Sequence, residues 1–289
     1  MMSHSEWRIL LKEAAGELTA AGIEQAHAEA TRLWCAVSGQ DLSQWVLNSG
    51  PISPNLIKEY RDAVRRRARH EPFHYIVGVR EFMGLNFHVD SRVLIPRPET
   101  EHLVERLLAD VPQKPLIIVD VGTGSGAIAV CLVHFGWSGW RVIATDVSEE
   151  ALAVAQLNAK NLLKRGHIDF VHGDLLTGIL EPIDIVVANL PYVTEEDGED
   201  CSPELSYEPR MALYAPEDGL QTIARLIEQM PSRLKPGGRV YLEVGIGQSD
   251  WVEKKLMAQG LTVLPRTRDL AGIDRVVAAR NHAATGEFS

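Results

Sequence analysis

The sequence predicts an α/β protein in which a doubly wound parallel β-sheet follows a small all-helical domain. Over the first ~70 residues, apolar side chains recur at the 3.6-residue spacing of amphipathic helices. From about residue 115 onward, short apolar runs alternate with helical stretches. Such alternation is typical of parallel strands that are joined by right-handed helical crossovers.

Length and composition limit the classes to which the chain can belong. The 289 residues are 45% hydrophobic and 24% charged, which are ordinary values for a globular protein of one large or two modest domains. The net charge of −10 argues against a protein that binds by coating nucleic-acid phosphates. The first 85 residues carry 10 basic and 10 acidic side chains, so the later residues carry the whole excess of negative charge.

Targeting and redox features predict a cytoplasmic protein. Charged side chains interrupt the first residues, which therefore lack the apolar core of a signal peptide. The most apolar stretch, Leu116–Phe135, contains Asp120 and three glycines, so it is not expected to span a membrane. The cysteines have no short spacing, which favours buried thiols over a disulfide framework or a zinc site; they are Cys35, Cys131 and Cys201.

The N-terminal region is predicted to hold three helices. Residues 5–20 and 24–38 each place their apolar side chains on one face. A third helix begins at the N-cap residue Ser53 with Pro54 in its first turn, and it ends before Glu71-Pro72. We interpret the arginine-rich residues 65–69 as a solvated helix end, with a binding patch as the alternative.

After Pro72 the spacing changes from helical to alternating. Residues 75–77, 81–83 and 85–89 are predicted to form short strands that turn at glycines. The domains expected are therefore a helical domain at 1–73, a β-hairpin linker at 74–97 and an α/β domain at 98–289.

Seven apolar runs in the α/β domain are candidate strands. They are Leu116–Asp120, Val142–Thr145, Ile168–Val171, Ile183–Ala188, Val240–Val244, Leu261–Leu264 and Arg275–Ala279. The predicted helices between them include Glu149–Leu163, capped by Ser148, and Leu220–Leu234. In a doubly wound sheet the ligand binds at the carboxyl ends of the strands, so we expect the functional residues directly after the strands.

A glycine-rich turn follows the first of these strands. It contains Asp120, Gly122, Thr123, Gly124, Ser125 and Gly126. Alternate glycines let the backbone turn sharply and approach a ligand without a Cβ in the way. The spacing differs from the dinucleotide-binding fingerprint and is the form found in S-adenosylmethionine enzymes. A glycine turn that serves only tight packing is the alternative.

Acidic residues end the next two strands. Asp146 can accept hydrogen bonds from both hydroxyls of a ribose, as acidic residues do in dinucleotide folds, although it could instead cap a helix. Asp174 ends the third strand and could read the edge of an adenine, which Leu175 could cover. Acceptors at three successive strand ends predict a nucleoside-binding site.

The fourth strand runs into Asn189-Leu190-Pro191-Tyr192. An amide oxygen, a backbone carbonyl and an aromatic face can together hold a planar NH2 group. Such a nitrogen is a weak nucleophile, so orienting its lone pair toward an electrophilic methyl is most of the catalysis that it needs. We therefore expect no metal. The alternative is a plain Asn-Pro turn.

Several longer segments resemble the PrmC/HemK family of peptide chain release factor glutamine methyltransferases. They are EPFHYIVGVREFMGLNFHVDSRVLIPRPETE at 71–101, DVGTGSGAIAV at 120–130, TDVS at 145–148, ANLPYV at 188–193, YEPRMALYAPEDGL at 207–220, LKPGGRVYLEVG at 234–245 and RDLAGIDRV at 268–276. The resemblance covers nearly the whole chain, and LIPRPETE and EPRMAL are its most diagnostic parts. It implies a Rossmann-like S-adenosylmethionine-dependent domain with six parallel strands and one antiparallel strand. This domain follows, along the chain, a helical domain that docks the release factor.

The resemblance also implies an activity and a set of site residues. Family members methylate the side-chain amide nitrogen of the glutamine in the Gly-Gly-Gln motif of class I release factors, which modulates translation termination, and they release S-adenosylhomocysteine. By position, Gly122 to Gly126 and Asp146 would hold S-adenosylmethionine, and Leu175 would lie by the adenine. Asn189 would face both cofactor and substrate as a catalytic residue with Tyr192, and Leu190-Pro191-Tyr192 would complete the glutamine pocket.

Leu190 departs from the family motif Asn-Pro-Pro-Tyr. The role of this position is a backbone carbonyl, which leucine also has, and Pro191 still keeps Leu190 extended. We expect retained activity and a slightly less rigid pocket. The acidic residues 195–200 lie in a long loop that is either a solvated surface or a second site for release-factor recognition, and Glu208 and Pro209 are predicted to anchor this loop.

Three other functions remain open from the sequence. An N6-adenine methyltransferase also acts on a planar NH2 group, but it needs a basic groove, which the charge balance does not favour. A glutamine methyltransferase of a ribosomal protein is closer in chemistry. A non-catalytic binding module would not need Asn189 beside an intact glycine loop. We expect a protein substrate, no direct nucleic-acid binding and no membrane partner.

Overall fold

The computed structural model describes residues 4–47, 52–194, 202–215 and 219–282. The chain divides into two compact units. The first comprises residues 1–79 together with 202–207, and the second comprises residues 80–201 and 208–289.

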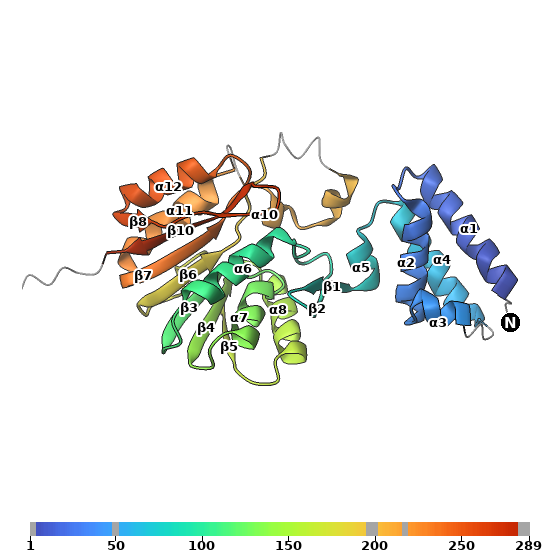
Figure 1. Ribbon diagram of the computed structural model, residues 1–289, viewed down its shortest axis with the longest axis horizontal. Coiled ribbons are helices and arrows are strands. Elements are labelled where there is room, and N and C mark those ends of the chain that lie inside the picture. The colour runs from blue at the N-terminus through green and yellow to red at the C-terminus, as the bar shows by residue number, and fades with distance from the viewer. Residues whose placement is uncertain (1–3, 48–51, 195–201, 216–218, 283–289) are drawn as a thin grey trace, which may run out of the picture. The chain divides into compact units, whose positions relative to one another are not determined.

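The first unit is helical, as predicted. Its helices are α1 (His4–Ala20), α2 (Ala26–Ser38), α3 (Leu42–Leu47), α4 (Pro54–Ala68) and α5 (Phe73–Val77), with the 3₁₀ turn η1 (Pro203–Tyr207) (Figure 1). Helix α4 begins as expected, because the Ser53 hydroxyl accepts a hydrogen bond from the Leu56 amide at 3.2 Å. Trp7, Trp34 and Trp45 pack with Tyr60 at the centre of the core, with ring centroids 4.9–6.3 Å apart.

One expectation for this region was wrong, and a second holds only in part. Residues 75–77 are not a strand but part of α5, because the carbonyl of Pro72 accepts from the amides of Tyr75 and Ile76 and so starts a helix. The arginine-rich helix end is not wholly solvated either, since Arg67 is 5% exposed and pairs with Glu204 at 2.5 Å. The predicted hairpin is present as β1 (Val79–Phe82) and β2 (Leu85–His88).

The second unit is built on the expected sheet. Its strands are β3 (Leu116–Val121), β4 (Trp140–Asp146), β5 (Ile168–His172), β6 (Ile183–Ala188), β7 (Leu234–Glu243), β8 (Leu261–Val263) and β10 (Asp274–Asn281). They lie in the order β5-β4-β3-β6-β7-β10-β8, and the two-residue β9 (Thr267–Arg268) pairs with β10. Strands β3 to β7 are parallel, whereas β10 is antiparallel to both neighbours. The seven-stranded, mostly parallel sheet is therefore confirmed.

Helices cover both faces of this sheet (Figure 1). One face packs against α6 (Glu99–Asp110), α7 (Ala127–Phe135), α8 (Glu149–Leu162) and the hairpin. The other packs against α11 (Gln221–Gln229) and α12 (Ser249–Ala258). The predicted helix Leu220–Leu234 was too long, because Pro231 lies in the 3₁₀ turn η2 (Met230–Ser232) and Leu234 already begins β7. Neither α6 nor α12 was predicted, although Leu103, Val104 and Leu107 of α6 have helical spacing and are buried.

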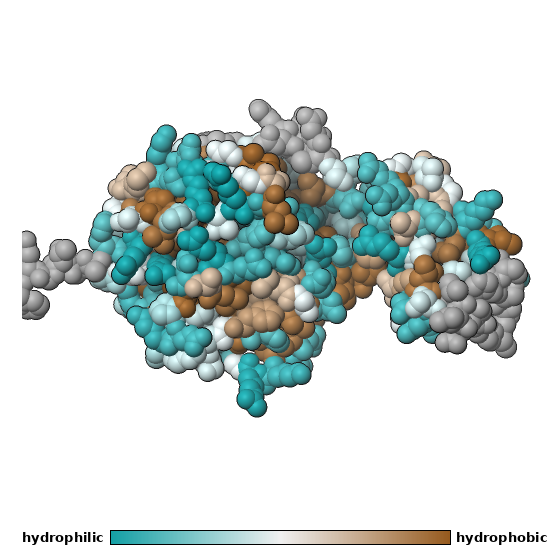
Figure 2. Space-filling view, in the orientation of Figure 1, coloured by the Kyte–Doolittle hydropathy of each residue, from teal (hydrophilic) through white to brown (hydrophobic). Residues whose placement is uncertain are grey.

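Most large apolar side chains are buried, and hydrophilic residues predominate on the face seen in Figure 2. Within the described ranges, no helix is both long and apolar enough to cross a bilayer. Cys35 and Cys131 are free thiols, and Cys201 lies outside the described residues. The described side chains include no group of three or more His, Cys, Asp and Glu arranged to hold a metal ion.

Candidate active site

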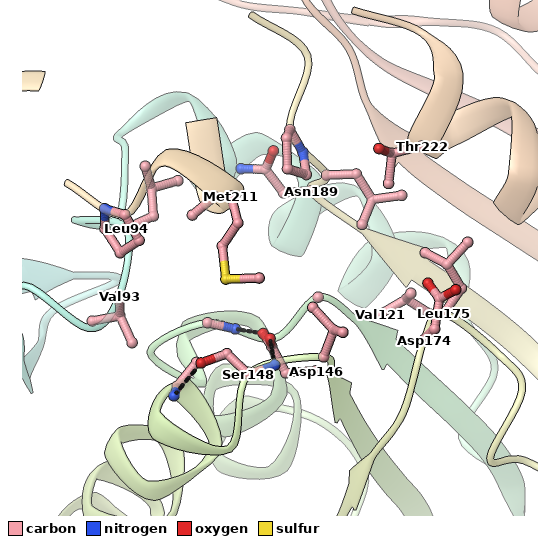
Figure 3. A pocket seen from close by; sticks show the side chains of 18 of the residues that line it. Val93, Leu94, Val121, Asp146, Ser148, Asp174, Leu175, Asn189, Met211 and Thr222 are labelled. Carbon is pink, nitrogen blue, oxygen red and sulfur yellow. Dashed lines mark hydrogen bonds between the residues drawn. The ribbon is translucent and has the colours of Figure 1, made fainter. Parts of the chain in front are cut away.

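A cavity of about 390 Å³ lies at the carboxyl ends of β3, β4, β5 and β6, where the sequence placed the site (Figure 3). Its lining includes Val121 and the glycine turn after β3, Asp146 at the end of β4, and Asp174 after β5. Asn189 follows β6 and lies across the cavity from Asp146. The volume is in the range of small-molecule sites, about 300–1,000 Å³. The strand order reverses between β3 and β6, so the cavity is at the topological switch point.

The glycine turn has a backbone that only glycine adopts without strain. Gly122, Gly124 and Gly126 have φ values of +73°, +53° and +80°. A Cβ on Gly122 would come within 3.0 Å of Leu190 Cδ2, and one on Gly126 within 3.0 Å of Ala155 Cβ. The amides of Gly122 and Thr123 both donate to the carbonyl of Thr145 at 2.9 Å, which ties the turn to β4. Gly122 and Gly124 line the cavity.

Asp120 lies beneath the glycine turn and not on the cavity wall. It is fully buried, and its Oδ2 accepts from Thr123 Oγ1 at 2.6 Å and from the Ala129 amide at 3.2 Å. Burial raises the pKa of this carboxyl to about 7. Thr123 and Ser125 are also buried, so these residues shape the turn and leave its backbone to face the cavity.

Asp146 presents its carboxylate to the cavity and also braces the glycine turn. Its two oxygens accept from the amides of Gly124 and Ser148, each at 2.9 Å (Figure 3). Burial raises its pKa. The N-cap of α8 is Ser148, whose hydroxyl accepts from the Ala151 amide at 3.2 Å, so Asp146 is not needed as the cap. A carboxylate has about four acceptor positions, and lone pairs therefore remain for the two hydroxyls of a ribose.

Asp174 and Leu175 form a further part of the wall (Figure 3). Asp174 pairs with Arg225 of α11, which also lines the cavity and which the sequence did not indicate. Leu175 is 7% exposed and has φ +54°, an uncommon value for a residue with a side chain. Its carbonyl accepts from Thr145 Oγ1 at 3.1 Å, which keeps this backbone in place.

The Asn-Leu-Pro segment after β6 reaches the cavity, whereas Tyr192 takes another position. Asn189, Leu190 and Pro191 line the wall, and Asn189 Nδ2 donates to Thr100 Oγ1 at 3.0 Å. In the described part of the chain, Tyr192 is not among the lining residues. Its hydroxyl is hydrogen-bonded to Glu243, and its carbonyl accepts from Gln248 Nε2 at 3.1 Å. Burial raises the pKa of Tyr192 to about 12, so the hydroxyl keeps its proton.

Two segments distant in sequence supply the apolar part of the wall. Val93 and Leu94 come from the loop before α6, and Pro209, Met211 and Ala212 come from the loop around the short helix α10 (Arg210–Leu213). Glu208 joins these segments, as an anchor was predicted to do. It is 5% exposed and accepts from the Ile95 amide at 3.0 Å and from Arg97 at 2.6 Å.

Sequence reasoning about strand ends did not find these wall residues, nor Thr100 and Glu243. The signal was present in the family-like segments 71–101, 207–220 and 234–245, which contain all of them except Arg225. Residues 195–200, the acidic loop that was a candidate for recognition, lie outside the described residues.

The comparisons with known proteins agree with both units. Residues 10–78 match the PrmC N-terminal domain, and residues 118–206 match a methyltransferase domain. A methyltransferase from Pyrococcus furiosus has the same fold, with a TM-score of 0.55 at 17% identity, and the alignment covers 75% of this chain and 98% of that one.

Two curated relatives are similar over most of their length. A release factor glutamine methyltransferase of Enterococcus faecalis is 40% identical over 246 residues, which is 83% of this chain and 87% of that protein. One of Cereibacter sphaeroides is 36% identical over 277 residues, which is 95% of this chain and 98% of that protein. Identity at this level over nearly complete chains, together with a cavity at the predicted strand ends, shows that the protein belongs to the release factor glutamine methyltransferase family.

Proposed function

We propose that the protein transfers a methyl group from S-adenosylmethionine to the side-chain amide nitrogen of the glutamine in the Gly-Gly-Gln motif of class I peptide chain release factors. This transfer would modulate translation termination. The observation that carries the proposal is the position of Asn189 across the cavity from Asp146, with Leu190 and Pro191 also in the lining, in a chain of this family. Because release factors act in translation, we infer a cytoplasmic location.

The cavity suits S-adenosylmethionine, the cofactor of the family. The backbone of Gly122 and Gly124 leaves room for close approach, and Asp146 retains acceptor lone pairs for the ribose hydroxyls. Asp174 and Leu175 would hold the adenine, as the sequence predicted. When bound, S-adenosylmethionine supplies an electrophilic methyl group.

The acceptor side of the cavity suits a planar amide. Asn189 Oδ1 and the carbonyl of Leu190 would accept the two N–H bonds of the glutamine side chain, which orients its weakly nucleophilic nitrogen. Tyr192 was predicted as a catalytic residue that stacks on the amide. In our proposal it instead supports this side of the cavity through its hydrogen bond to Glu243.

The helical domain of residues 1–73 would dock the release factor, with the loop at 195–200 as the second candidate. None of the described residues of 1–73 lines the cavity, so this domain can be varied without changing the cavity lining. Charge reversal of residues 195–200 should raise the KM for the release factor if the loop takes part in docking. An unchanged KM would leave the helical domain as the docking surface.

The test is transfer of a labelled methyl group from S-adenosylmethionine to a purified class I release factor. We expect label on the wild-type factor and none on a factor in which the glutamine of the Gly-Gly-Gln motif is replaced by alanine. Parallel reactions would contain DNA, RNA or ribosomal proteins. Label on DNA or RNA but not on the release factor would support an N6-adenine methyltransferase. Label on a ribosomal protein alone would identify that protein as the substrate.

A further inference from the structure

A chain of buried hydrogen bonds lies behind Asn189. Asn189 Nδ2 donates to Thr100 Oγ1 at 3.0 Å. Hydrogen bonding from the hydroxyls of Thr100 and Tyr192 lowers the pKa of the Glu243 carboxyl, whose second oxygen, Oε2, is buried without a partner among the described residues. Thr100 is 4% exposed and Glu243 is 2% exposed, and neither lines the cavity. The hydrogen bond between Thr100 and Asn189 therefore links these two buried side chains to the cavity wall.

The fold brings these residues together from three elements. Ala188 of β6 pairs with Leu242 of β7, so Asn189 and Glu243 are the next residues along two adjacent parallel strands. Thr100 lies in the first turn of α6, within the LIPRPETE segment that marks the family resemblance. This segment does not follow a strand of the large sheet, so the strand ends do not point to it.

The direction of the hydrogen bonds sets the orientation of the Asn189 amide. Above its pKa of about 7, the Glu243 carboxyl is ionised and only accepts, so Thr100 and Tyr192 then donate their single hydroxyl protons to it. The Thr100 oxygen is then left with lone pairs alone, and it must face the NH2 group of Asn189. The amide oxygen of Asn189 consequently points away from Thr100.

This orientation is the one that methyl transfer to an amide requires. An oxygen toward the acceptor nitrogen takes one of its N–H bonds, whereas a reversed amide would set one NH2 group against another. We propose that Thr100 and Glu243 are positioning residues that hold the Asn189 oxygen toward the methyl-acceptor NH2 group, an inference that rests on the proposed function for the identity of that group.

Each of the two decisive variants changes one heavy atom of the Thr100 side chain. Thr100→Val keeps the branched shape but removes the acceptor oxygen, and Thr100→Ser keeps the oxygen but removes a methyl group. At pH 8, kcat with the release factor should fall about 10- to 100-fold in Thr100→Val because the acceptor nitrogen is misoriented. Thr100→Ser should recover most of this loss. The Kd for S-adenosylmethionine should stay within about twofold in both, since neither variant changes a lining residue.

Three results would overturn the inference. They are an unchanged kcat in Thr100→Val, an equal loss of kcat in both variants, and a parallel loss of S-adenosylmethionine affinity. Thermal unfolding of both variants separates misorientation from a general loss of structure. If the wild-type protein does not label a release factor, the proposed function fails and the positioning role is decided by a second measurement.

That second measurement is independent of the substrate. In protein labelled with ¹⁵N-asparagine, the side-chain NH2 signal of Asn189 is assigned by its loss in Asn189→Asp. One of its protons should exchange slowly in the wild type and in Thr100→Ser, and it should exchange at least about tenfold faster in Thr100→Val. Equal exchange rates in the three proteins would show that Thr100 does not hold the amide.

Discussion

The cofactor side and the acceptor side of the cavity are built in different ways. The cofactor side is built mainly from backbone groups. The amides of Gly122, Thr123 and Gly124 donate hydrogen bonds to the Thr145 carbonyl and the Asp146 carboxylate on the adjacent strand. On the acceptor side, one side-chain amide is held by side chains far away in sequence. Thr100 is 89 residues from Asn189, and Glu243 lies on another strand.

This difference explains why the cofactor side is easier to predict from the sequence than the acceptor side. A backbone site needs residues that permit an unusual φ, and glycines at fixed spacing record this need directly. A side-chain site needs partners that only the fold brings together. The same contrast predicts that substitutions on the cofactor side change the binding of S-adenosylmethionine, whereas those on the acceptor side change turnover.

The largest expected effect is that of Asn189→Ala on the acceptor side. Loss of the amide should lower kcat by about 10²- to 10³-fold, because the substrate nitrogen is no longer oriented. The Kd for S-adenosylmethionine, measured by calorimetry, should rise less than about threefold. Equal losses of turnover and cofactor affinity would mean that Asn189 mainly supports the cofactor side, which would remove the contrast.

The next effect is that of Gly122→Ala on the cofactor side. The new Cβ would sit at φ +73° and only 3.0 Å from Leu190 Cδ2, so the turn must move. We expect the Kd for S-adenosylmethionine to rise about 10- to 100-fold, from strain of about 1–2 kcal/mol and the contact itself. The double variant Gly122→Ala/Leu190→Ala removes the contact but not the strain, and it should recover part of the affinity. No recovery would leave the backbone conformation as the sole cause.

The buried carboxyl of Glu243 should make the free energy of unfolding of the protein depend on pH. Burial raises its pKa to about 7, well above its value of about 4.3 in an unfolded chain. Between these values the folded protein binds more protons than the unfolded chain, so this group stabilises the fold at low pH and loses that contribution as the pH rises to about 7. The neighbouring charges that act on this carboxyl are Glu99, which raises its pKa, and Arg275, which lowers it.

Chemical denaturation at pH 5 and pH 8 measures the effect. The free energy of unfolding of Glu243→Gln relative to the wild type should increase by about 3 kcal/mol between the two pH values. The matched control is Glu105→Gln, an exposed position in the same region, and it should show no such change. A constant difference between Glu243→Gln and the wild type would mean that the carboxyl titrates alike in both states.

The smallest effect is expected for Leu190→Pro, which restores the usual family motif. The role of this position is a backbone carbonyl, which both residues have. Proline would remove the side chain that packs against Gly122 but would stiffen the backbone. We expect kcat to change less than about threefold. A much larger change would show that the Leu190 side chain itself shapes the acceptor side.

The sequence by itself determined the sheet, its strand ends and most residues of the cofactor side. Apolar runs, the Ser53 and Ser148 caps and the glycine spacing are local signals, and local geometry follows from them. The prediction for residues 75–77 was wrong, because their alternating apolar side chains favoured a strand. A hydrogen-bonded turn from Pro72 made them a helix.

Only the tertiary structure decided the rest of the site. Glu208 meets Arg97 across 111 residues, Asp174 meets Arg225 across 51, and Asn189 meets Thr100 across 89. No local spacing specifies such pairs, because each depends on where separate helices and loops meet the edge of the sheet. The orientation of the Asn189 amide is of this kind, since it depends on a hydroxyl from α6 and a carboxylate from β7.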